Sequence, residues 1–152
     1  MSAVRRFDED GALIDVVQPD AFAGLSLAEA KSLRIREIND EWRRRAYAGV
    51  TVGGVTISTR EAADAQLRNL VERLTAADQS DGNEVGTKME GYVTEGGDDV
   101  DLNALSAEAA RVAARDYFAE CGLRERALVD LVRAAGDVAG VAAIDIQAGW
   151  PS

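Results

Sequence analysis

The residues with the strongest potential for binding chemistry stand in the run "WRRRAY", where Trp42 is followed by Arg43, Arg44 and Arg45. This run is the only concentrated positive charge in the sequence, and guanidinium groups can hold an acidic protein surface or a phosphate backbone. The alternative is an exposed helix face, because acidic residues precede the arginines and Trp42 would point inward. We take these four residues as the candidate partner-binding site.

The sequence offers few residues in an arrangement that is typical of catalysis. The chain has 27 acidic residues, no histidine and one cysteine, Cys121. Carboxylate pairs can act as general acid and base, yet Asp145, between two isoleucines, has no second acid beside it. Cys121 has no histidine to activate it and falls on an apolar stripe, which favours a buried thiol. The sequence therefore predicts a protein that is not an enzyme and has no cofactor.

Metal binding is disfavoured by the same inspection. The segment "DQSDGNE" superficially resembles a calcium loop, but with Gly82 in the glycine position the first ligand would be Ala77 and the closing acid Lys88. The acidic residues Asp98, Asp99 and Asp101 could bind a hard cation, or they could form a solvated turn. We favour the turn and predict no metal site.

Composition limits the partners. The formal net charge is −10, and nucleic-acid binding needs a basic face, so nucleic acid is an unlikely partner. The first residues lack the apolar stretch of a secretory signal, and no later stretch reaches the length of a membrane span. We expect a soluble protein made in the cytoplasm, with no membrane partner.

The element that must position Trp42 and the arginines is a helix. Ser26 and Glu29 have the spacing of a capping box, and the predicted helix runs to about Tyr47. Its apolar stripe consists of Ile35, Ile38, Trp42 and Ala46.

The run "VTVGGVTI" predicts a hairpin, because a Gly-Gly loop fits the turns that match strand twist. This turn sets Val52 opposite Val55 and Val50 opposite Ile57. Ser58 and Glu61 predict a second capping box, opening a helix that ends near Ala77. Its inner face would hold Ala63, Leu67, Leu70, Val71 and Leu74.

Residues 78–86 are rich in turn formers and predict a surface loop. A second hairpin follows over residues 87–102, with Val93 opposite Val100. Asn103 is predicted to cap one long helix that continues through Gly122, although a break at that glycine is the alternative. The inner stripe of this helix is Ala114, Phe118, Cys121, Leu128, Val132 and Ala135.

After Gly136 closes this helix, Asp137 is predicted to cap a short helical turn. The final segment would then bring Ile144, Ile146 and Trp150 to the core. The predicted fold is α+β and mainly helical, with three main helices, two β-hairpins and a short C-terminal helical turn. Residues 25–152 form a single domain in this interpretation, preceded by an N-terminal arm of residues 1–24 that carries Ile14, Val16 and Val17 before Pro19.

The order of these segments carries a family resemblance. "LAEAKSLRIREINDEWRRR", "GVTVGGVTISTREAADAQLRNL", "YVTEGGDDVDLNA" and the ending "AAIDIQAGWP" follow one another over residues 26–151. In this order they resemble a domain-of-unknown-function family found in tailed phages and prophages, beside or within tail-fibre and tail-assembly genes. Members often carry a glutamine in the setting of Gln66 and a histidine in the last long helix, which this chain lacks.

The resemblance implies a structural protein in the tail region of the virion, acting as an adaptor that binds other phage virion or tail proteins. The alternative is a tail-fibre assembly chaperone, which would leave before the particle is complete. A small carboxylate-dependent hydrolase is a third hypothesis. We also expect a possible homo-oligomer, with Trp42 or the arm as its contact.

Overall fold

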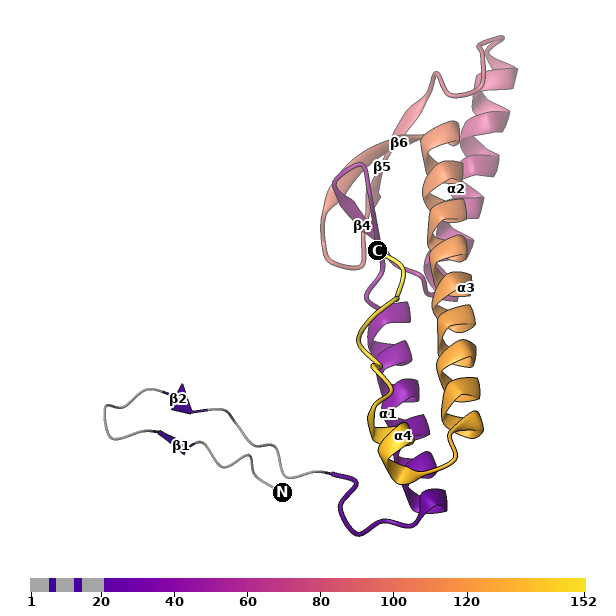
Figure 1. The fold of residues 1–152 in the computed structure, drawn as a ribbon. Helices are drawn as coiled ribbons and strands as arrows, with labels where there is room; N and C mark the ends of the chain where they lie inside the picture. Colours follow the sequence, from indigo (N-terminus) through magenta and orange to yellow (C-terminus); the bar gives the residue numbers. More distant parts are fainter. Residues whose placement is uncertain (1–5, 8–12, 15–20) are drawn as a thin grey trace.

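The structure, a computed structural model, describes residues 6–7, 13–14 and 21–152. Within them the chain forms helices α1 (Leu27–Ala46), α2 (Glu61–Ser80), α3 (Ala104–Ala134) and α4 (Val138–Ala142) (Figure 1). The strands are β1 (Arg6–Phe7), β2 (Leu13–Ile14), β3 (Val50–Val52), β4 (Val55–Ile57), β5 (Met89–Val93) and β6 (Asp99–Asn103). The mainly helical α+β fold is confirmed.

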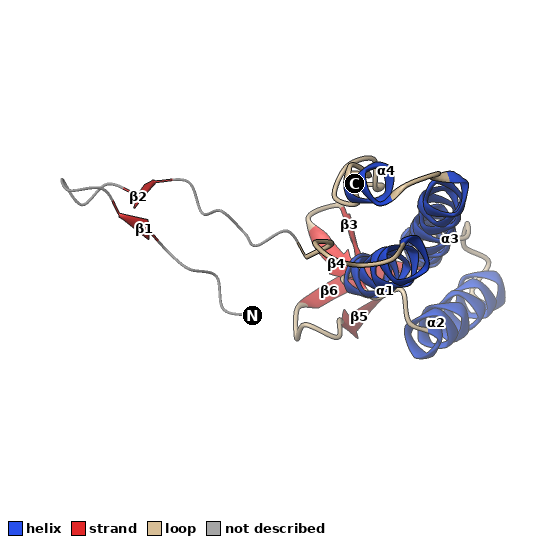
Figure 2. Cartoon of the chain, turned by 60° about the horizontal axis from the view of Figure 1, so that its bottom comes forward, coloured by secondary structure: helices blue, strands red, loops and turns tan. Residues whose placement is uncertain are grey.

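The other two long helices both pack on helix α3. Helix α2 lies along its N-terminal half and α1 along its C-terminal half, and both run opposite to α3 (Figure 1). Figure 2 looks down this group and shows the long axes running alongside one another. The chain therefore places two helices one after the other against a single longer one.

Two hydrophobic cores follow from this arrangement. The α1 core consists of Phe22, Ala30, Ile38, Ala46, Cys121, Leu128, Val129, Val132, Val141 and Trp150. The α2 core consists of Ile57, Leu67, Leu70, Leu74, Ala104, Ala107, Ala110 and Ala114. The alanines let α2 approach α3 closely, because a methyl side chain needs little space between two helix axes.

Helix α1 begins as predicted. The Glu29 carboxylate accepts a hydrogen bond from the Ser26 backbone N–H at 2.8 Å, and the Glu29 N–H donates to the Ser26 hydroxyl at 3.3 Å. The pKa of Glu29 is lowered because the Ser26 backbone N–H and the Ser26 hydroxyl both donate to its carboxylate and favour the charged form. The helix ends at Ala46, with Tyr47 as its C-cap, close to the predicted end.

The first hairpin has the predicted register. Val52 pairs with Val55 and Val50 with Ile57, so these side chains share the face that packs on the α2 core. The turn residues Gly53 and Gly54 both have positive φ, which a Gly-Gly pair adopts without strain.

The predicted capping box at the start of α2 is wrong. Arg60 is the N-cap residue and makes no side-chain capping bond. Ser58 lies two positions before the N-cap, directly after β4, and its hydroxyl accepts a hydrogen bond from the Arg60 N–H at 3.3 Å. The hydroxyl therefore stabilises the turn between β4 and α2 rather than the first turn of the helix.

The end of α2 also differs from the prediction, because the helix continues to Ser80. Asp78 was assigned to a surface loop, yet its side chain is fully buried. Its two carboxylate oxygens accept hydrogen bonds from the backbone N–H groups of Gly86 and Lys88, each at 2.9 Å. Asp78 thereby ties the end of α2 to the segment that leads into β5.

The register of the second hairpin differs from the prediction by one residue. Val100 lies opposite Tyr92, and Val93 lies opposite Asp99. The turn closes one residue earlier because the Thr94 N–H donates to the Asp98 carbonyl at 2.8 Å and the Thr94 hydroxyl accepts from the Asp98 N–H at 3.0 Å. A shift of one residue exchanges the two faces of a strand, so Tyr92 packs on the α2 core and Val93 is exposed.

Helix α3 confirms the long-helix prediction and passes through Gly122 without a break. Asn103 caps it by accepting from the Ser106 N–H at 2.8 Å. Asp137 caps α4 in the same way, accepting from the Gly140 N–H at 2.7 Å.

The final segment returns to the α1 core. Ile144 and Ile146 pack against that core, and Trp150 is buried within it. The Trp150 indole N–H donates to the Ile146 carbonyl at 2.8 Å. Two bonds from the Arg124 guanidinium to the Ala148 carbonyl, at 2.8 and 3.1 Å, hold the segment to α3. This matches the expectation that the final segment brings Ile144, Ile146 and Trp150 to the core.

The predicted arm lies mostly outside the described residues, including Val16, Val17 and Pro19. The part that is described contains the short pairing of β1 with β2, in which Arg6 lies opposite Ile14 and Phe7 opposite Leu13. Phe22 is buried in the α1 core, whereas Ala21, Ala23 and Gly24 are exposed, so Phe22 alone anchors this end of the arm to the domain. None of the helices in the described residues is both long and apolar enough to cross a membrane.

Candidate partner-binding surface

The four predicted site residues do not form one continuous surface. Trp42 is half-buried, and its ring meets Tyr47 and Phe118 edge-on, at 6.0 and 5.9 Å between ring centroids. Arg43 and Arg44 are exposed at the side of α1, whereas the Arg45 guanidinium lies 5.7 Å from the Trp150 ring centroid. Trp42 and Arg45 therefore contact other elements, whereas the side chains of Arg43 and Arg44 are exposed to solvent.

The carboxylate of Glu41 binds two of the three arginines. Glu41 is nearly buried and accepts a hydrogen bond from Arg44 Nε at 2.9 Å and another from Arg45 Nε. The bonded guanidinium of Arg44, followed by that of Arg45, lowers the pKa of Glu41 to about 2. Arg45 also donates to the Gln147 carbonyl at 3.3 Å, so this group joins α1 to the C-terminal segment. Arg44 and Arg45 of the predicted charge cluster are thus bound to groups within the protein.

A cleft beside Trp42 is a better candidate for binding a partner. Its volume is about 610 Å³, and it lies where the end of α1, the start of α2 and the middle of α3 meet. The lining residues are Tyr47, Thr59, Arg60, Glu61, Asp64, Arg115 and Phe118. The hydroxyl of Thr59 donates to the Ala46 carbonyl and holds the chain at this junction.

Aromatic rings and charges meet in this junction cleft. Tyr47 and Phe118 lie 5.7 Å apart between ring centroids, and the Arg60 guanidinium stands 5.1 Å from the Tyr47 centroid. Arg60 also forms an ion pair with Glu95 at 3.2 Å. Arg115 is exposed and makes no hydrogen bond or ion pair within residues 21–152, so its charge is available to a partner.

Sequence reasoning did not identify this cleft. Tyr47 was assigned only as the end of a helix, Phe118 only as a core residue, and Arg115 was not singled out. The one signal was Trp42, whose ring contacts both aromatic walls. No spacing rule brings residues 47, 60 and 115 together, because only the packing of three helices does so.

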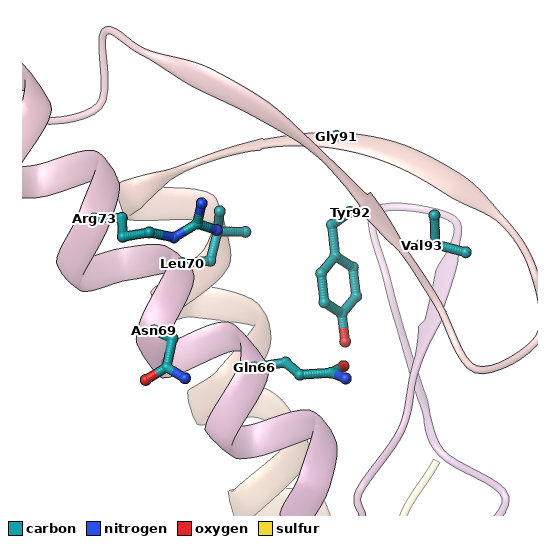
Figure 3. A pocket seen from close by; sticks show the side chains of 7 residues that line it. All are labelled: Gln66, Asn69, Leu70, Arg73, Gly91, Tyr92 and Val93. Atoms are coloured by element: carbon teal, nitrogen blue, oxygen red, sulfur yellow. The ribbon is translucent and has the colours of Figure 1, made fainter.

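A second opening of about 460 Å³ lies between α2 and β5. Figure 3 shows Tyr92 directing its hydroxyl toward the Gln66 amide, with Arg73 placed further along α2. The Arg73 guanidinium is paired with Glu90 at 2.9 Å, which neutralises the charge at this groove. The groove offers amide and phenol groups but fewer aromatic and cationic contacts than the junction cleft.

The side chains considered for chemistry remain apart. The pKa values of Glu29, Glu41 and Glu108 are all lowered by hydrogen bonds to their charged forms, whereas a general acid at neutral pH needs a raised pKa. Cys121 is buried, and burial raises the pKa of its thiol. The Asp145 carboxylate accepts from the Gln147 N–H at 2.8 Å in a local turn.

The described residues also offer no group of three or more His, Cys, Asp or Glu side chains arranged to hold a metal ion. Asp98 lies in the turn of the second hairpin, with Asp99 and Asp101 on β6.

No family model matches the sequence, and neither a curated protein nor a solved structure matches it.

Proposed function

We propose that this protein is a phage virion protein, an adaptor in the tail region that binds another tail protein through the junction cleft. The order of sequence segments that resembles a phage tail-associated family supports the context. The cleft itself supports binding, because aromatic and arginine side chains contribute most of the energy at protein interfaces.

The observation that carries this proposal is the combination in one cleft of the Tyr47 ring with Arg115, which forms no ion pair within the part of the chain that the structure describes. Tyr47 is 43% exposed although it contacts two other aromatic rings. A partner that covers this ring would remove apolar surface from water, and an acidic side chain on the partner would pair with Arg115.

The first test asks whether the protein is a component of the purified particle. Mass spectrometry of purified particles, from the phage or prophage that encodes the chain, is expected to detect the protein at a fixed copy number. Co-expression with the tail fibre distinguishes the chaperone alternative: a chaperone raises the yield of soluble fibre and is missing from finished particles. Absence from the particles would overturn the structural role.

The second test is the cleft. Arg115→Glu reverses a charge that forms no ion pair within the described residues and only attracts Glu108 through space, so thermal melting should change little while incorporation into particles falls at least about 10-fold. Arg36→Glu is a matched control, because Arg36 is an exposed arginine on α1 away from the cleft. Equal incorporation of both variants would show that the cleft is not the contact.

A further inference from the structure

The outward face of α3 is exposed at Leu105, Val112 and Leu123, although the Leu105 side chain lies beside Gly86. Both α1 and α2 pack on the opposite face, where the buried residues are Ala107, Ala110, Ala114, Cys121, Leu128 and Val132. At 100° per residue, Leu105, Val112 and Leu123 fall within about 20° of one line on the outward face. Their side chains are 62%, 41% and 63% exposed.

This outward stripe distinguishes α3 from the other long helices. The described residues contain eight exposed large hydrophobic side chains, of which Leu105, Val112, Leu123 and Leu131 lie on α3. None lies within α1 or α2. Single exposed hydrophobic residues are common on protein surfaces, but a line of them along one helix marks an interaction site.

The spacing of the stripe suits a second helix. Residues 105, 109, 112, 116, 119 and 123 follow one another at intervals of four and three, the repeat by which two helices pack along a shared seam. Ala109 and Ala119 are exposed between the larger residues, which allows a close approach. The interval pattern therefore favours a helix rather than a strand or a loop as the occupant.

Two charges on this face identify the occupant. Asp116 and Arg126 are exposed and form no ion pair within the described residues. Each stands five residues from Cys121, so the two are symmetric about residue 121, which lies two residues beyond the midpoint of α3. They are about 15 Å apart along α3, too far to pair within one copy.

We propose that the outward face of α3 binds α3 of a second copy of this chain, with the two helices antiparallel about a two-fold axis near residue 121. In this arrangement Asp116 meets Arg126 of the second copy, and Leu123 meets Ala119 of the second copy. Val112 lies opposite Asp130 of the second copy, and Leu105 lies beyond the end of the paired helices, so the apolar contact is centred on Leu123. Each contact occurs twice because the interface is self-complementary. A parallel pair would instead place Asp116 against Asp116, which is repulsive.

Analytical ultracentrifugation of the full-length chain up to about 1 mM tests the proposal, and a concentration-dependent dimer is expected. Leu123→Glu should weaken dimerisation at least about 100-fold, because it inserts two charges beside the symmetry axis. Val93→Glu is the matched control: Val93 is also 63% exposed but lies on β5, and the dimer should persist. Circular dichroism melting confirms that both variants are folded.

A charge exchange tests the orientation. Asp116→Arg and Arg126→Asp should each weaken the dimer, and the double variant should restore it, because the pair forms only between copies. A chain that remains a monomer at the highest concentration, or a dimer unaffected by Leu123→Glu, would overturn the interface. A double variant weaker than both single variants would overturn the antiparallel arrangement.

Discussion

The two cores on either side of the middle of α3 are closed by different means. The α1 core is rich in aromatic rings, and arginines bond the backbone carbonyls around it: Arg34 reaches Ala142 at 2.7 Å and Arg124 reaches Ala148 at 2.8 Å. The α2 core is built from aliphatic side chains and alanine, and its far end is closed by the buried carboxylate of Asp78.

This difference shows how one helix can stabilise two unlike halves. Long arginine side chains keep their charge near solvent while they satisfy carbonyls, so the α1 core distributes its polar contacts over several residues. At the end of α2 the polar contacts are concentrated in the Asp78 carboxylate. Loss of this carboxylate leaves two backbone N–H groups without a partner. The halves should therefore respond differently to single substitutions.

The largest expected effect is in the α1 core. Trp150→Ala should lower the free energy of unfolding by about 4 kcal/mol, because it removes a buried ring and leaves a cavity. Urea denaturation measures this loss. Gln147→Ala, an exposed change in the same segment, should have almost no effect. A small loss for Trp150→Ala would mean that the C-terminal segment does not close the α1 core.

The α2 core should depend most on Asp78. Asp78→Ala should cost about 3 kcal/mol, because two backbone N–H groups lose a charged acceptor. Hydrogen exchange at Gly86 and Lys88 should accelerate in the same variant. Asp81→Ala, which removes only an exposed ion pair with Lys88, should change stability by less than about 1 kcal/mol. Similar losses for both variants would contradict a special role for the buried carboxylate.

Acid should act on the α1 half through Glu41. Because the folded pKa of Glu41, about 2, lies below its ordinary value of 4.5, its stabilisation is present above pH 4.5 and is lost as the pH falls toward 2. We expect this loss to reach about 2 kcal/mol, after allowance for the exposed Arg44. Glu41→Gln should flatten the stability profile between these pH values, whereas Glu120→Gln, at an exposed position, should leave it unchanged.

The smallest expected effect compares the starts of α1 and α2. Ser26→Ala removes a capping box and should cost about 1 kcal/mol, whereas Ser58→Ala removes no cap and should cost less than about 0.5 kcal/mol. Thermal melting of the two variants in parallel measures the difference. Equal losses would show that Ser58 contributes to the start of α2 after all.

The sequence predicted the elements whose signals are local. The Ser26 and Asn103 caps, the Gly-Gly turn and the stripe of α3 each depend on residues within one or two turns of the chain. Two of the errors arose where a buried polar group decides the geometry, whereas the error at Ser58 arose because the helix begins two residues later than the capping pattern predicted. Thr94 sets the register of the second hairpin, and Asp78 extends α2, and neither role is visible in a periodic pattern.

The candidate surface could be predicted only in part. Trp42 was predicted as a partner-binding residue and lies in an aromatic cluster beside the cleft, but the arginine run is not a single surface because Glu41 is buried and binds two of the three arginines. The junction cleft depends on three helices meeting at one point. Local spacing carries no information about such a meeting, because the packing that creates it is long-range.

The continuity of α3 limits how the length of this chain can change. The α2 core uses α3 as far as Ala114, and the α1 core uses it from Tyr117 onward. One residue inserted between Arg115 and Asp116 would turn one core by about 100° and move it by about 1.5 Å relative to the other. The connection from α1 through β3 and β4 to α2 is too short to follow such a rotation. Seven inserted residues would bring the rotation back to within about 20° but would move the cores about 10.5 Å apart, so even this insertion should need a matching extension of the connection between α1 and α2.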